Sequence, residues 1–96
     1  MLNFEWDKEK ALSNTKKHGI DFSEATTIFS DQYEITITDP IHSVDEYRFI
    51  SIGVSENKSL LVVSYTERHP DMIRIISARK ASKKEFRYYE QNCRIQ

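Results

Sequence analysis

Four segments rich in β-branched and aromatic residues follow one another between residues 33 and 79, and the links between the last three are very short. The segments are YEITIT at 33–38, YRFISIGV at 47–54, SLLVVSYT at 59–66 and MIRIISAR at 72–79. This composition is typical of strands. The links at 55–58 and 67–71 are too short to carry a parallel crossover, so we predict that these strands form an antiparallel meander.

The N-terminal part of the chain carries one strand signal and one helix signal. LNFEW at 2–6 alternates apolar and polar side chains, which suits a short strand with one buried face. Asp7 is a suitable N-cap and Gly19 a suitable left-handed stop, so a helix is predicted over about residues 8–18.

Two capping boxes predict further helices. Asp21 and Glu24 have the required spacing, and so do Ser82 and Glu85 near the C-terminus. The element order β, α, α, β, β, β, β, α predicts an α+β fold, with a twisted antiparallel sheet packed against N-terminal helices and followed by a C-terminal helix. A chain of 96 residues suits one domain, over residues 1–96.

Composition excludes several classes of protein. No apolar run approaches the roughly 20 residues that cross a bilayer, and the N-terminus lacks the layout of a secretion signal. The chain has one cysteine, Cys93, and its histidines, His18, His42 and His69, are widely spaced, so no disulfide and no metal site is expected. With 2 glycines there is no glycine-rich nucleotide loop. We therefore expect a cytoplasmic protein without a membrane partner, a metal or another cofactor.

Charge is unevenly distributed along the chain although the net charge is only −1. Residues 20–57 carry eight acidic side chains and one basic one, whereas residues 58–96 carry nine basic and four acidic ones. A fold that keeps these segments on different surfaces would attract a polyanion to one of them. Alternatively the segments interleave in space and their charges pair across the surface.

A set of cations and hydroxyls suggests phosphate chemistry. Its members are Lys16, Lys17, His18, Arg48, Tyr65, Arg74, Arg79 and Lys80. RNA carries its own nucleophile, the 2′-hydroxyl, so a protein can cleave it without a metal by orienting that group, assisting proton transfer and stabilising the charged phosphorane. Arginine suits the last role because its planar fork matches phosphate oxygens and stays charged. For each residue the alternative is an ordinary surface ion pair.

The strand register determines which of these side chains can act together. Simple registers place Arg48, Tyr65 and Ile73 side by side on one sheet face, with Arg79 further along it and Arg74 on the opposite face. A slip of one residue would move every side chain to the other face. The way in which the candidates group on the two faces therefore depends on the register. The list of candidate residues depends on it less.

The sequence resembles the BrnT toxins of bacterial type II toxin-antitoxin modules. The resemblance rests on FEWD at 4–7, KHG at 17–19, Phe22 with Ala25, Asp45-Glu46 with Arg48, Gly53, VVSYTER at 62–68, IRIISARKA at 73–81, Glu85 and Tyr89. It implies a RelE-like ribonuclease fold and inhibition of translation by RNA cleavage. It also implies neutralisation by a BrnA-like antitoxin with a ribbon-helix-helix domain, and operator DNA bound only through the toxin-antitoxin complex.

The resemblance also suggests roles for individual residues, which we state as expectations. Arg48 and Arg79 would bind phosphate or stabilise the transition state, Lys17 and His18 would contact substrate or transfer protons, and Glu46 would act as orienter or base. The expected RNA contacts are Arg74, Tyr65, Lys80 and Lys16. Two rival explanations remain: His18 suits the end of a helix, and Glu46 can simply pair with Arg48. The alternative function is an antitoxin-binding module without catalysis.

Overall fold

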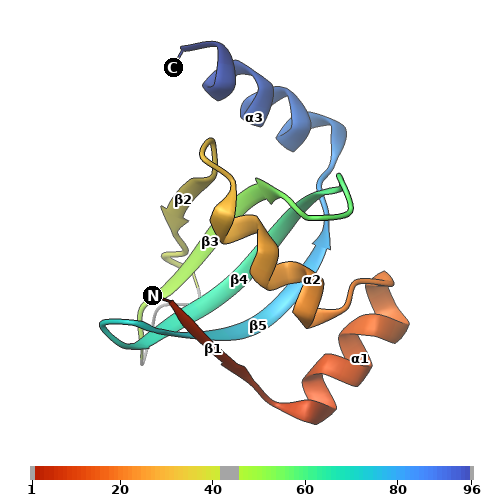
Figure 1. Ribbon diagram of the computed structural model, residues 1–96, viewed down its shortest axis with the longest axis vertical. Coiled ribbons are helices and arrows are strands. Elements are labelled where there is room, and N and C mark those ends of the chain that lie inside the picture. The colour runs from red at the N-terminus through yellow and green to blue at the C-terminus, as the bar shows by residue number, and fades with distance from the viewer. Residues whose placement is uncertain (1, 42–45, 96) are drawn as a thin grey trace.

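The computed structural model describes residues 2–41 and 46–95 and is an α+β fold built on a five-stranded sheet (Figure 1). Its elements in chain order are β1 (Asn3–Trp6), α1 (Lys8–His18), α2 (Phe22–Thr26), the 3-10 helix η1 (Thr27–Ser30), β2 (Ile35–Thr38), β3 (Arg48–Val54), β4 (Leu60–His69), β5 (Met72–Lys80) and α3 (Lys83–Ile95). Every strand and helix expected from the sequence is present. Within the described ranges no helix is long and apolar enough to cross a membrane.

The sheet has the order β1-β5-β4-β3-β2 and is mixed. Strands β2 to β5 form the predicted antiparallel meander. The expectation of a wholly antiparallel sheet is wrong for β1, which pairs in parallel with β5. Because two helices and three strands separate β1 from β5 along the chain, the connection is long enough for the two strands to run in the same direction.

Helix ends follow the local signals in the sequence. The Asp7 carboxylate accepts hydrogen bonds from the backbone N–H groups of Glu9 and Lys10 at the start of α1, and Gly19 ends that helix with φ +72°. The Ser82 hydroxyl accepts from the Glu85 N–H at 3.2 Å, and the Glu85 carboxylate accepts from the Ser82 N–H at 2.8 Å. The predicted bounds of α1 and the predicted start of α3 are therefore confirmed. The sequence contains these signals because a helix cap depends only on neighbouring residues.

Helix α2 and the following η1 cover one face of the sheet, as Figure 1 shows. The buried core beneath them consists of Ile20, Phe22, Ala25, Ile28, Leu61, Val63, Tyr65, Ile73, Ile75 and Ala78. At Gly53 of β3 an added Cβ would lie 3.1 Å from both the Cβ and the carbonyl oxygen of Ile28. Glycine at this position therefore lets η1 lie directly on β3.

Helix α3 packs on the opposite face of the sheet and covers only one end of it. Tyr89 is buried against Ile52 and Val62, and its hydroxyl donates to the Asp31 carboxylate. Figure 1 shows α3 at the far end of the molecule from α1. Away from the end that α3 covers, Ser64, Arg74 and Ser77 of this face are half-buried and Arg79 is exposed.

Candidate functional site

Three arginines project from the sheet face that α2 does not cover. Arg48 lies opposite Thr66, Thr66 lies opposite Arg74, and Arg79 lies opposite Val62. Residues that face each other across strands share a sheet face, and so do residues two apart along a strand. We call this surface, made of Arg48, Ser64, Thr66, Arg74, Ser77 and Arg79, the arginine face.

The spacing of the strands gives the size of the arginine face. Arg48 and Arg74 lie two strands apart, which is about 10 Å between backbones. Arg79 lies four residues further along β4, from Thr66 to Val62, which is about 13 Å at the usual rise of a strand. Arginine side chains are long enough for their guanidinium groups to reach one bound polyanion from these positions.

A bulge in β5 places Arg74 and Arg79 on the same face. Their separation of five residues would put them on opposite faces of a regular strand. The register between β4 and β5 shifts between Ser64, which faces Ser77, and Tyr65, which faces Ile75. Ile76 is therefore an extra residue in β5, and it restores the two arginines to one face.

The predicted grouping of side chains is corrected by this register. Arg48 lies beside Thr66 and not beside Tyr65, and Arg74 shares the face of Arg48 and Arg79. The simple register failed for Arg74 because it assumed an unbulged β5. It failed for Tyr65 because β3 and β4 pair one residue away from the expected register, so that Arg48 faces Thr66. Tyr65 is moved to the opposite, helix-covered face.

Arg74 is held by an acidic residue from β1. Glu5 faces Arg74 in the parallel pairing, and Arg74 Nη1 donates to Glu5 Oε2 at 2.9 Å. Arg68 Nε lies 3.9 Å from the same oxygen. The Arg74 side chain keeps 30% of its surface exposed, so it remains within reach of a ligand on the arginine face.

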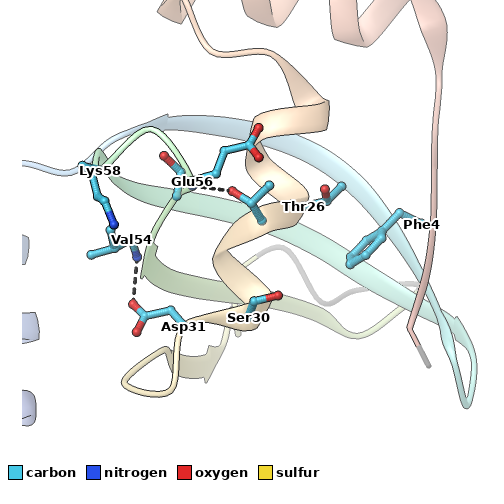
Figure 2. A pocket seen from close by; sticks show the side chains of 9 residues that line it. Phe4, Thr26, Ser30, Asp31, Val54, Glu56 and Lys58 are labelled. Atoms are coloured by element: carbon cyan, nitrogen blue, oxygen red, sulfur yellow. Dashed lines mark hydrogen bonds between the residues drawn. The ribbon is translucent and has the colours of Figure 1, made fainter.

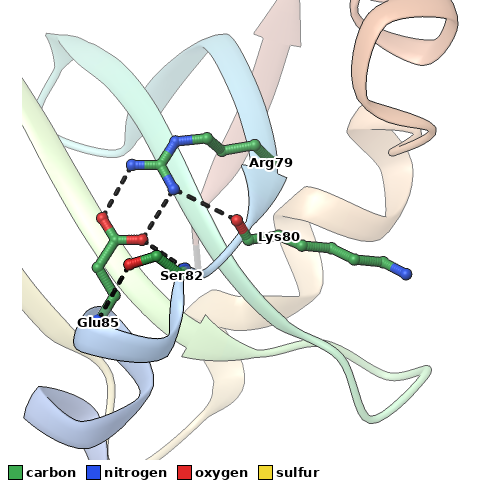
Figure 3. A network of polar contacts seen from close by, with 4 residues as sticks. All are labelled: Arg79, Lys80, Ser82 and Glu85. Carbon is green, nitrogen blue, oxygen red and sulfur yellow. Dashed lines mark hydrogen bonds and ion pairs between the residues drawn. The ribbon is translucent and has the colours of Figure 1, made fainter.

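Arg79 is held more tightly, by a residue of α3 (Figure 3). Its Nη1 and Nη2 donate to the two carboxylate oxygens of Glu85, each at 2.8 Å, and Nη1 also donates to the Lys80 carbonyl at 3.3 Å. The Arg79 bonds lower the pKa of Glu85 to about 2. Glu85 is thus a carboxylate at physiological pH, while 44% of the Arg79 side chain remains exposed.

Hydroxyl groups lie between the arginines. Ser64 and Ser77 face each other in the middle of the arginine face, and Thr66 lies between Arg48 and Arg74. Thr66 is only 2% exposed, and its hydroxyl has no hydrogen-bond partner among the described residues. These groups make the centre of the face polar and able to donate hydrogen bonds.

Asn14 attaches α1 to the free edge of β5. Strand β1 pairs with β5 only as far as Ile75, and further along the buried Asn14 amide exchanges hydrogen bonds with the Ala78 backbone, at 2.8 Å and 3.1 Å. Its Nδ2 also donates to the Ile20 carbonyl at 3.0 Å. The side chain therefore continues the pairing that a longer β1 would have provided.

This attachment brings the end of α1 to the border of the arginine face. Lys17, His18 and Ser77 line the same shallow hollow of about 190 Å³. Lys16, the third residue of the predicted basic cluster, is exposed on α1 outside the lining of that hollow. Two of the three predicted α1 residues thus lie beside Ser77, which precedes Arg79 by two residues in β5.

Two further predicted residues, Tyr65 and Lys80, lie away from this surface, and a third, Glu46, precedes Arg48 by two residues in the chain. Tyr65 is 4% exposed, its hydroxyl is 2.8 Å from that of Ser51, and burial raises its pKa. Lys80 is exposed and extends away from Arg79 in Figure 3. Glu46 is exposed and precedes β3. Asp45, which is part of the resemblance, and His42, which was considered as a metal ligand, lie outside the described residues.

Comparison with known proteins identifies the family. Residues 6–85 match the family model of BrnT, the ribonuclease toxin of type II toxin-antitoxin systems. The chain belongs to the BrnT family. The crystal structure of the Brucella abortus ribonuclease toxin BrnT is similar, with a TM-score of 0.63 and 25% identity, over 86% of this chain and 100% of that one. A comparison with curated protein sequences gave no significant match.

Membership of the BrnT family fixes the class of substrate and partner. The family consists of ribonuclease toxins of type II toxin-antitoxin systems, so RNA is the substrate class and an antitoxin the partner class. Among the described residues, no three His, Cys, Asp or Glu side chains gather closely enough to hold a metal ion.

The hollow drawn in Figure 2, with a volume of about 590 Å³, shares no lining residue with the arginine face. It opens between η1 and the turn from β3 to β4. Asp31 accepts from the Val54 N–H at 2.8 Å and Thr27 accepts from the Glu56 N–H at 2.9 Å, which fix its walls. Lys58 is the one basic residue of its lining. These features favour a structural role.

Sequence reasoning missed Glu5, Thr66 and Ser77 as parts of the site. Glu5 reaches Arg74 only because β1 returns beside β5, and no local pattern encodes that return. Ser77 was expected on the face of Arg79 but was not taken as a site residue, and the bulge brings Arg74 to the same face. Glu85 was recognised as a capping residue, but its bond to Arg79 depends on the angle at which α3 leaves the sheet.

Proposed function

We propose that residues 1–96 form a single RelE-like toxin domain, an endoribonuclease that cleaves RNA on the arginine face without a metal ion and so inhibits translation. The observation that carries this proposal is the placement of Arg48, Arg74 and Arg79 on one open sheet face. Fixed cations of this kind stabilise the charge that accumulates on a phosphorane. Family membership supports the same reaction class.

The reaction proceeds by attack of the RNA 2′-hydroxyl on the adjacent phosphorus. The 2′-oxygen forms a bond to phosphorus and the bond to the 5′-oxygen breaks, which leaves a 2′,3′-cyclic phosphate. Attack of water on this cyclic phosphate then breaks the bond to the 2′-oxygen and leaves a 3′-phosphate end. One proton leaves the 2′-hydroxyl and another reaches the departing 5′-oxygen. Arg48 and Arg79 hold the phosphate oxygens, and Arg74 holds the neighbouring phosphate, with Ser77 as a hydroxyl donor.

Proton transfer is assigned to residues at the border of this face. Lys17 and His18 lie beside Ser77 at the end of α1, and an imidazole is the side chain that most readily exchanges protons near neutral pH. Glu46, just before β3, orients the substrate or acts as the base. Lys16 and Lys80 contact more distant phosphates, whereas the buried Tyr65 is left out of the proposed site.

The carboxylates beside two of the arginines do not prevent RNA binding. Ion pairs exposed to solvent contribute only about 1 kcal/mol or less. Glu5 and Arg74 are 39% and 30% exposed, so a phosphate can share the guanidinium or displace the carboxylate. The strongest pair, Arg79 with Glu85, leaves other donors of Arg79 available.

The proposal includes the partners of the module. We propose that a BrnA-like antitoxin with a ribbon-helix-helix domain neutralises the toxin in the cytoplasm, and that operator DNA is bound only by the toxin-antitoxin complex. The ion pairs of Arg74 and Arg79 use Glu5 and Glu85, which lie outside the acidic segment 20–57. Part of the basic charge is therefore neutralised locally, and the exposed acids Asp21, Glu46 and Glu56 of segment 20–57 can face a basic partner.

A non-catalytic antitoxin-binding module is the second candidate. It is favoured by the carboxylates already bound to Arg74 and Arg79. It is also favoured by apolar side chains near the open end of the sheet, where Ile37, Ile41 and Tyr47 are 44%, 79% and 76% exposed. Expression without the antitoxin separates the two candidates, because an active ribonuclease arrests growth and a binding module does not.

The reaction itself is tested with purified toxin and RNA in excess EDTA. We expect cleavage to persist and the new ends to carry a 2′,3′-cyclic or 3′-phosphate. Cleavage that appears only after Mg²⁺ is added, or ends with a 3′-hydroxyl, would contradict the metal-free mechanism. Absence of cleavage under both conditions, together with normal growth, would favour the binding module.

A further inference from the structure

Arg79 has more hydrogen-bond donors than Glu85 and the backbone occupy. A guanidinium carries five N–H groups in one plane. Two of them point at the Glu85 carboxylate and a third points at the Lys80 carbonyl, all from Nη1 and Nη2. The two that remain are the Nε–H and the second N–H of Nη2, which are parallel and form a fork on the edge of the group away from Glu85.

We propose that Glu85 is a positioning residue that orients Arg79 so that this second fork receives the RNA phosphate. The proposal rests on the ribonuclease function proposed above. Two parallel N–H groups match two oxygens of a phosphate, as in bidentate arginine–phosphate pairs. Glu85 fixes the plane of the guanidinium through both of its oxygens, so Arg79 does not have to be ordered when the substrate arrives.

Glu85 is itself fixed by the start of α3. Its carboxylate accepts from the Ser82 N–H at 2.8 Å and its own N–H donates to the Ser82 hydroxyl at 3.2 Å. Figure 3 shows that Arg79, Glu85 and Ser82 form one continuous network. The capping box thus performs two tasks: it starts α3 and it anchors the carboxylate that orients Arg79.

The opposite role for Glu85 is that of a competitor that blocks Arg79. Two features favour positioning. The carboxylate occupies the end of the guanidinium and leaves the side edge, and 44% of the Arg79 side chain stays exposed despite the pair. If Glu85 competes with RNA for Arg79, removing Glu85 should raise the cleavage rate. If Glu85 positions Arg79, removing Glu85 should lower the cleavage rate. The two roles therefore predict opposite signs for the same substitution.

The test is a double-mutant cycle on RNA cleavage with Glu85→Ala, Arg79→Ala and the double variant. We expect Glu85→Ala to lower the cleavage rate by about tenfold, the order seen when residues that orient metal ligands are removed. In the Arg79→Ala background the same change should have no further effect. Glu85→Gln, which keeps one acceptor oxygen, should lie between wild type and Glu85→Ala.

Glu90→Ala is the matched control, because it removes another carboxylate of α3, 48% exposed, whose ion-pair partner is Arg94 at 3.9 Å. Its cleavage rate should equal that of wild type, and thermal unfolding of every variant shows which of them are folded at the assay temperature. The positioning role of Glu85 would be overturned if Glu85→Ala cleaved RNA faster than wild type. It would also be overturned if Glu85→Ala lowered the cleavage rate equally in the wild-type protein and in Arg79→Ala. Neither result would overturn the proposed ribonuclease function. Unchanged cleavage in Arg79→Ala would overturn the proposed role of Arg79 as well.

Discussion

Replacing Asn14 with alanine should destabilise the protein far more than an exposed change in the same helix. Asn14 is 6% exposed, and its amide makes three hydrogen bonds with the backbone of Ile20 and Ala78. The substitution removes all three and leaves one backbone N–H and one carbonyl of β5 without their partner at an edge that β1 does not reach. It also releases the helix that carries Lys17 to the arginine face.

The size of the effect follows from those bonds. A buried hydrogen bond contributes about 1 kcal/mol net, and a buried group left without a partner costs about 1–3 kcal/mol. Three bonds together suggest a loss of about 3 kcal/mol, a large part of the 5–15 kcal/mol that stabilises a typical domain. In a domain of this size each kcal/mol lowers Tm by about 4–8 °C, so Tm should fall by roughly 12–24 °C.

Urea unfolding followed by circular dichroism measures this loss directly. Ser13→Ala, an exposed neighbour in α1, is the control and should change the unfolding free energy by about 0.5 kcal/mol or less. Asn14→Asp should be worse than Asn14→Ala at pH 7, because a carboxylate would then face two carbonyl oxygens. A loss below about 1 kcal/mol for Asn14→Ala would refute the edge-pairing role of Asn14.

Three further outcomes are expected. The pKa of Glu85 is lowered from 4.5 to about 2, so the contribution of its ion pair with Arg79 to the free energy of unfolding is complete above pH 4.5 and is lost as pH falls toward 2. Because the pair is partly exposed, we expect this contribution to be only about 1 kcal/mol. Unfolding measured between pH 6 and pH 3 checks this, and Glu85→Gln should lack that part of the pH dependence. Gly53→Ala should cost about 1–3 kcal/mol by crowding Ile28, and thermal unfolding equal to wild type would contradict the close approach of η1. Tyr65→Phe should cost about 1 kcal/mol through the lost bond to Ser51 while RNA cleavage stays unchanged; lost cleavage in a folded variant would return Tyr65 to the site.

The elements of the fold were predictable because their signals are local. The helix from Asp7 to Gly19 has its cap and its stop within its own sequence, and the capping box at Ser82 starts α3 in the same way. The meander followed from links too short for any other connection. Such features depend on residues a few positions apart, so a single sequence contains them.

The grouping of the site residues was not predictable, because it depends on contacts between distant segments. The bulge at Ile76 puts Arg74 on the same face of the sheet as Arg79. Nothing in the segment IRIISAR marks the extra residue. The parallel pairing that brings Glu5 to Arg74 joins opposite ends of the chain. Tyr65 was expected beside Arg48, and it lies in the core instead.

The central claim is that the arginine face binds and cleaves RNA, and the cleavage rate of single arginine variants tests it most directly. Arg94 is the matched control, since it is an arginine 76% exposed on α3 away from the proposed site. We expect Arg48→Ala and Arg79→Ala to lower the rate about a hundredfold, the order seen when one charge-stabilising donor is removed. Arg74→Ala should lower it less, and Arg94→Ala should not change it. Equal rates in all four folded variants would contradict the account.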